Sequence, residues 1–201
     1  MAVVCKKTDF VFKAQNIPRF LGCGPRNRTK DENIQHAIDN YIIPDGRLNQ
    51  KYYDSLDVET SEKGHNKVFQ DYLDKQIFTE QNKHDGISEI VGEMTYTPRE
   101  QPTGIAKIEV NEKIGLLSEL HGITRDSKTV IMWDEYWNRP KLPYGVEDEI
   151  KIKMLGTMAV WKAKKCIYIL SEMNNQTITL DFDSEKWQDI LTKLQEIDYG
   201  I

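Results

Sequence analysis

The sequence predicts an α/β or α+β domain in which a mixed β-sheet is flanked by helices. Segments towards both ends of the chain repeat apolar side chains at helical spacing, whereas several segments in its second half alternate apolar and polar side chains as strands do. The predicted order is helices first, then three strands, a helix, two strands and a closing helix. Such an order is typical of helices packed over a sheet.

Two stretches in the N-terminal half are predicted to be helices because their apolar side chains recur every three or four residues. They are residues 31–42, which follow a polar approach rich in helix-starting residues, and residues 62–78. Between them, Pro44, Asp45 and Gly46 interrupt the period and predict a turn and loop. The second of these helices is expected to pack one face on a core.

The C-terminal half supplies the strands and two further helices. The segments with strand character are 106–110, 128–133, 165–170 and 177–182. Residues 145–161 predict a helix with apolar side chains on more than one side, which is expected to be well buried. Residues 184–197 predict an amphipathic closing helix, with either Asp183 or Ser184 as its cap.

A chain of 201 residues fits one domain, residues 1–201, with one sizeable core. No apolar run approaches the ~20 residues that cross a bilayer, and the N-terminus lacks the order of a secretory signal, so no membrane association is expected. Three widely spaced cysteines argue against a disulfide framework and fit a reducing compartment. We expect an intracellular protein of the cytoplasm or nucleus, not a secreted one.

The net charge of −5 does not favour nucleic-acid binding driven by the charge of the whole protein. A local positive groove stays open, because five lysines gather in one short stretch. They are Lys151, Lys153, Lys162, Lys164 and Lys165. The alternative is a solvated helix edge.

Two segments resemble a known family. Residues 116–139, "LLSELHGITRDSKTVIMWDEYWNR", have the shape of the strand hairpin of PD-(D/E)XK nucleases of the lambda-exonuclease or YqaJ kind, and residues 147–170 resemble the helix and strand that follow it. The resemblance runs from about Gly64 to the C-terminus. It implies a restriction-endonuclease-like core over residues 64–201, with a central mixed sheet, preceded by a helical and loop extension over residues 1–63.

The family's catalytic residues are only partly present. The aspartate position before Gly122 is His121, and the Glu-x-Lys becomes Glu135 followed by Tyr136 and Trp137, so only its glutamate is kept. In the next helix, the family's glutamine falls on or near Lys153, and its tyrosine falls on Thr157.

The lost groups matter because such a site holds Mg²⁺ through oxygen ligands and uses a lysine to orient or deprotonate the attacking water. If the protein is active, the resemblance implies Mg²⁺ or Mn²⁺ as cofactor and a catalytic set of Glu135, Lys153 and His121. The implied metal ligands are Glu135, Asp134, Glu119 and His121. Asp126 is a further candidate for a second carboxylate.

Each of these residues also has a plain structural explanation. His121 fits a turn or surface histidine, and imidazole favours later transition metals over magnesium. Trp133, Tyr136 and Trp137 fit core or interface positions as well as base-stacking platforms. Glu135 fits an ion pair with a nearby cation.

The sequence therefore predicts a nucleic-acid-associated protein with a lambda-exonuclease-like fold and a degenerate or modified site, and it leaves a viral source open. The expected partners are DNA and a protein in a larger assembly. One alternative is an active exonuclease dependent on a divalent metal, which predicts DNA degradation that is lost in Glu135→Ala. The other is a structural or adaptor protein of a viral particle, which predicts a different strand order.

Overall fold

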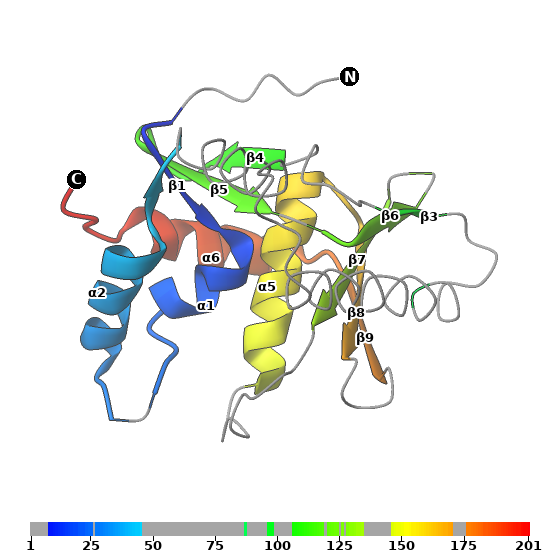
Figure 1. Cartoon of the computed structure of the whole chain (residues 1–201), viewed down its shortest axis with the longest axis horizontal. Helices are drawn as coiled ribbons and strands as arrows, with labels where there is room; N and C mark the ends of the chain where they lie inside the picture. The colour runs from blue at the N-terminus through cyan, green and yellow to red at the C-terminus, as the bar shows by residue number, and fades with distance from the viewer. Residues whose placement is uncertain are drawn as a thin grey trace, which may run out of the picture.

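The computed structural model describes residues 8–25, 27–45, 87, 96–98, 106–118, 120–124, 126, 128–134, 146–170 and 176–201, and for residues 96–98, 106, 134, 146, 147 and 176 it describes the backbone alone. The strands form two mixed sheets, with orders β2-β1-β5-β4 and β3-β6-β7-β8-β9, and helices flank them (Figure 1). The predicted fold class is confirmed, with two sheets in place of one central sheet.

The first sheet joins segments that lie about a hundred residues apart. Strand β1 (Phe10–Lys13) pairs in parallel with β5 (Ile114–Ser118), while β2 (Ile43–Pro44) and β4 (Ala106–Glu109) are antiparallel edge strands. Every residue of β5 is buried, as expected for an inner strand covered on both faces. Strand β1 belongs to the predicted extension 1–63 and is nevertheless an inner strand of this sheet; the boundary at residue 63 stays a prediction.

An ion pair ties the edges of the first sheet together. The Nζ atom of Lys107 on β4 lies 2.6 Å from Oδ2 of Asp45, which directly follows β2, and 3.3 Å from the Thr8 hydroxyl. Gly115 of β5 makes room for it, because a Cβ there would lie 2.7 Å from that hydroxyl and 2.9 Å from Cδ of Lys107. The charged side chains are only 13% and 19% exposed.

We expect Asp45→Asn to destabilise the fold by about 1–2 kcal/mol, between the values for exposed and buried pairs, because it removes the carboxylate from the largely buried Lys107 charge. Urea unfolding measures the loss. The double variant Asp45→Asn/Lys107→Met should recover part of it. Equal losses for the single and double variants would contradict a coupled pair.

The second sheet contains the hairpin that the sequence singled out. Its strands in spatial order are β3 (Tyr96–Pro98), β6 (Gly122–Thr124), β7 (Thr129–Asp134), β8 (Lys165–Leu170) and β9 (Gln176–Asp181). Only β7 and β8 are parallel. The four predicted strands correspond to β4, β7, β8 and β9 and are confirmed.

Helix α5 (Val146–Trp161) connects the parallel pair and lies between the two sheets (Figure 1). Parallel neighbours need such a crossover. Its side chains at Met154, Leu155 and Met158 are at most 3% exposed, which confirms the prediction of a helix buried on more than one side.

Two short helices precede the longer ones in the chain. They are η1 (Ala14–Asn16) and α1 (Ile17–Phe20), and both contact α5. Helix α2 (Lys30–Tyr41) confirms the prediction at 31–42 and begins with a capping box between Thr29 and Glu32.

Helix α6 (Ser184–Gln195) confirms the predicted closing helix. Asp183 is its cap, and the Asp183 carboxylate accepts hydrogen bonds from the amides of Glu185 and Lys186. The predicted helix 62–78 lies outside the described residues. No helix in the described part of the chain is both long and apolar enough to cross a bilayer.

Candidate functional site

A cavity of about 180 Å³ opens where η1, α1, α5 and the β6–β7 hairpin meet. Its lining residues come from six elements, η1, α1, α2, β7, α5 and β8, and from His121, which directly precedes β6. The lining residues are Gln15, Asn16, Pro18, Arg19, Tyr41, His121, Met132, Trp133, Glu149, Lys153 and Tyr168. Two of the three predicted catalytic residues, His121 and Lys153, are therefore brought together, 32 positions apart in the sequence.

The hairpin fixes the position of His121 through two hydrogen bonds. The His121 amide donates to the carbonyl of Ile131 at 3.0 Å, which continues the β6–β7 pairing by one residue. The amide of Trp133 donates to Nδ1 of His121 at 2.9 Å. The imidazole is therefore held by the main chain of β7, and it is not a freely rotating turn or surface histidine.

Lys153 reaches the cavity from the middle of α5 and is 7% exposed. Glu149, one turn earlier on the helix, is the only carboxylate among the described lining side chains. Thr157, at the position matched to the family's tyrosine, is fully buried and accepts a hydrogen bond from the Ser118 hydroxyl at 3.1 Å. Thr157 thus fastens α5 to β5 and does not line the cavity.

The N-terminal segment supplies residues that the sequence analysis missed. Gln15 and Arg19 line the cavity from η1 and α1. The Oε1 atom of Gln15 is buried and has no hydrogen-bond partner within the part of the chain that the structure describes. Arg19 donates from Nη1 to the carbonyl of Cys23 at 3.3 Å. No local spacing marks these residues, because their place depends on the pairing of β1 with β5.

The side chains of the remaining predicted ligands lie outside the part of the chain that the structure describes. Glu119 and Glu135 lie outside the described residues, and for Asp134 only the backbone is described, paired with Leu170 at the end of β7. All three lie next to cavity segments in the chain: Glu119 precedes His121 by two positions, and Asp134 and Glu135 follow Trp133.

The described residues alone do not fit a magnesium site. No group of three His, Cys, Asp or Glu side chains gathers among them. The cavity instead presents Arg19 and Lys153 beside a single carboxylate, whereas Mg²⁺ takes oxygen ligands. The fit of a metal thus depends on the side chains of Glu119, Asp134 and Glu135.

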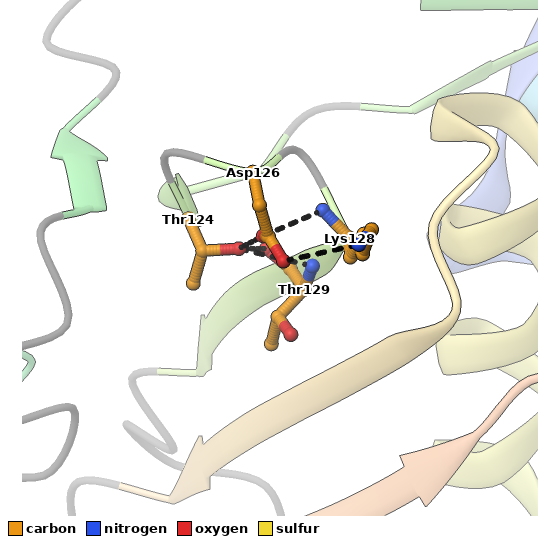
Figure 2. Close-up of polar contacts among 4 residues, drawn as sticks. All are labelled: Thr124, Asp126, Lys128 and Thr129. Atoms are coloured by element: carbon orange, nitrogen blue, oxygen red, sulfur yellow. Dashed lines mark hydrogen bonds and ion pairs between the residues drawn. The ribbon is translucent and has the colours of Figure 1, made fainter.

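Asp126 lies at the other end of the hairpin from His121, in the β6–β7 turn (Figure 2). Its Oδ1 atom accepts the Thr124 hydroxyl at 2.7 Å and the Lys128 amide at 3.0 Å. These hydrogen bonds lower the pKa of Asp126 from its ordinary value of 3.8, and the one from the Thr124 hydroxyl has the larger effect. Asp126 is a turn residue and does not line the cavity.

A pH prediction follows for this turn. Because the pKa of Asp126 is lowered on folding, its contribution to stability is present above the ordinary pKa and is lost as the pH falls through the lowered one. We expect Asp126→Asn to be less stable than wild type at neutral pH and this difference to shrink below about pH 4. Urea unfolding of the wild type and of Asp126→Asn, at neutral pH and below about pH 4, tests this expectation. A difference that persists at low pH would show that the carboxylate charge is not its source.

The predicted lysine cluster divides between two places. Lys153 lines the cavity, whereas Lys162, Lys164 and Lys165 are exposed around the connection from α5 to β8. Lys165 lies 3.9 Å from the Asp181 carboxylate. The exposed members form a solvated edge, and only Lys153 contributes to the cavity.

The fold resembles that of known exonucleases. An alkaline exonuclease from Laribacter hongkongensis, LHK-Exo, aligns with a TM-score of 0.50 at 14% identity, over 90% of this chain and 82% of the exonuclease. The same enzyme in complex with dAMP gives a TM-score of 0.51 at 14% identity, over 92% and 84% of the two chains. A phage-related exonuclease from Haemophilus somnus 129PT gives 0.43 at 12% identity, over 95% and 91%.

At such identity the likeness shows the fold alone. No protein-family description matches the sequence, and no curated protein matches it. The chain therefore has an exonuclease-like α+β fold, in keeping with the predicted resemblance at the level of architecture.

Proposed function

We propose that the protein binds nucleic acid, with the cavity receiving a phosphate group of a chain end, on a degenerate scaffold of the PD-(D/E)XK type. The observation that carries the proposal is the convergence of Arg19 and Lys153 on one small cavity with one described carboxylate. Cations in a partly closed site attract phosphate oxygens more strongly than cations on an open surface. DNA is the proposed ligand because the exonuclease-like fold, although not evidence of activity, raises the expectation of a nucleic-acid ligand.

The net charge of −5 is compatible with this proposal because the attraction is local. Arg19 and Lys153 come from segments far apart in the sequence. Their shared positive charge at the cavity therefore does not appear as a cluster of basic residues along the chain. A cavity that binds only the end of a chain also contacts few phosphate groups. The affinity should therefore depend only weakly on salt concentration compared with that of a protein that lies along the duplex.

A second candidate is an active exonuclease dependent on Mg²⁺ or Mn²⁺. The observation that favours it is the position of Asp134 and Glu135, which directly follow the cavity residue Trp133 in the chain, with Glu119 close to His121. Carboxylates from these two segments would supply oxygen ligands beside Lys153. In that case Glu135→Ala should abolish cleavage.

One set of measurements separates the two candidates. Binding and cleavage of linear single-stranded, linear double-stranded and closed circular DNA are measured with Mg²⁺, Mn²⁺ or EDTA. Binding of linear over circular DNA with little cleavage supports the end-binding proposal, whereas metal-dependent cleavage lost in Glu135→Ala supports the active enzyme. If folded protein binds none of these DNAs, the proposed function is wrong.

A further inference from the structure

The side-chain amide of Gln15 is a polar group that the protein itself leaves unused. Its Oε1 atom is buried and has no hydrogen-bond partner among the described residues. Nearly all buried polar atoms in folded proteins have a partner, because a buried atom without one has lost water and gained nothing in return. Exceptions of this kind are expected at functional sites. Since Gln15 lines the cavity, a ligand bound there is a suitable partner.

Gln15 lies next to the arginine to which the phosphate is assigned. Gln15 and Arg19 are four positions apart, in η1 and in α1, and these two helices follow each other without a break. Side chains four positions apart on a helix are neighbours, and both line the cavity. The Arg19 guanidinium has five N–H donors, more than its contact with the Cys23 carbonyl uses. A phosphate held by Arg19 therefore brings the adjoining sugar close to the Gln15 amide.

The unused atom is an acceptor, so its partner must be a donor. The phosphates within a nucleic-acid chain offer only acceptor oxygens, whereas the bases offer N–H groups and a chain end offers a free sugar hydroxyl. A hydroxyl has one O–H donor and two lone pairs, so it matches an amide, which has both an acceptor and a donor end. The last torsion of a glutamine side chain is soft, which lets the amide turn towards such a group. Of these groups, only the hydroxyl is specific to a chain end.

We propose that the cavity selects a chain end that carries a free sugar hydroxyl, and that Gln15 accepts a hydrogen bond from this hydroxyl through Oε1 while Arg19 binds the neighbouring phosphate. The proposal rests on the proposed function for the binding of DNA. It holds with or without a metal ion in the site, because Gln15 is not among the predicted metal ligands. Gln15 is thus a binding residue that sets specificity.

Four versions of one short single-stranded DNA test the ligand side of this contact. They carry hydroxyls at both ends, at the 5′ end only, at the 3′ end only or at neither end, with hydrogen in place of each missing hydroxyl. We expect wild type to bind the version without hydroxyls about tenfold more weakly than the version with both. The two intermediate versions identify the end that is bound. Equal affinities for all four would overturn the proposal, because their phosphates are the same.

Gln15→Met tests the protein side, because methionine has the length of glutamine without its polar amide. We expect this variant to bind all four DNAs as weakly as wild type binds the version without hydroxyls, so that the two deletions are not additive. Its free energy of unfolding in urea should equal or exceed that of wild type, because the oxygen that is lost has no partner in the described segments. A preference for hydroxyls that persists in Gln15→Met, or a clear loss of stability, would overturn the proposal.

Gln35→Met is the matched control. Gln35 is exposed on α2, where its Nε2 atom donates to the Asp39 carboxylate at 2.8 Å, and it does not line the cavity. This variant should keep the hydroxyl preference of wild type. The titrations are made in EDTA, which prevents metal-dependent cleavage. If folded wild type binds none of the four DNAs, the proposed function and the contact fail together, whereas equal binding of all four shows that only the contact is wrong.

Discussion

Replacing Gly156 with valine is expected to destabilise the fold by about 3 kcal/mol and to abolish ligand binding at the cavity. A Cβ atom on Gly156 would overlap Cδ1 of Ile17 and lie 3.4 Å from Cβ of Ala14. Ile17 is fully buried, so its side chain has little space to move away. Valine would therefore push η1 and α1 off α5, and with them Gln15 and Arg19, which line the cavity. Urea unfolding and a DNA-binding titration measure the two effects.

Gly156→Ala provides a graded control for this prediction. Alanine favours the helix by about 1 kcal/mol over glycine. This gain offsets part of the destabilisation that the overlapping Cβ atom causes. Ile17→Val removes the Cδ1 atom that the new Cβ would meet. In the Ile17→Val background, Gly156→Ala should therefore be neutral or stabilising, and the double-mutant cycle should report a favourable coupling between the two positions. Additive losses in the cycle would mean that the contact between α5 and α1 is not what requires glycine.

The elements that the sequence predicted well are those whose pattern is local. Helix α6 has a cap and an apolar stripe within 15 residues, Asp183 to Ile197, and β8 coincides with the predicted strand 165–170. Strand β1 and helices η1 and α1 were missed, since each has four residues or fewer. Strand β1 is held by its parallel pairing with β5, about a hundred residues away, and such a non-local pairing leaves no periodicity in the sequence to detect.

The candidate site divides in the same way. His121 and Lys153 were predicted to share a site because the resemblance placed them on a hairpin and on the helix that follows it, and both line the cavity. Gln15 and Arg19 were not predicted, because their segment reaches the cavity only through β1 and the Gly156 contact. The hydrogen bond from the Trp133 amide to Nδ1 of His121 was not predictable either, since it depends on the pairing register of β6 and β7.

Lys153→Met is expected to weaken the binding of linear DNA about 30-fold, equivalent to about 2 kcal/mol. Lys153 is 7% exposed and lines the cavity, so a phosphate bound there would lose a contact from which water is largely excluded. Lys151→Met is the matched control: it changes the net charge equally on the same helix, but its side chain does not line the cavity. Titration by fluorescence anisotropy should show a large loss for Lys153→Met and a small, salt-dependent one for Lys151→Met. Equal losses would mean that DNA responds to positive charge on this helix in general, and the cavity would then not be the binding site.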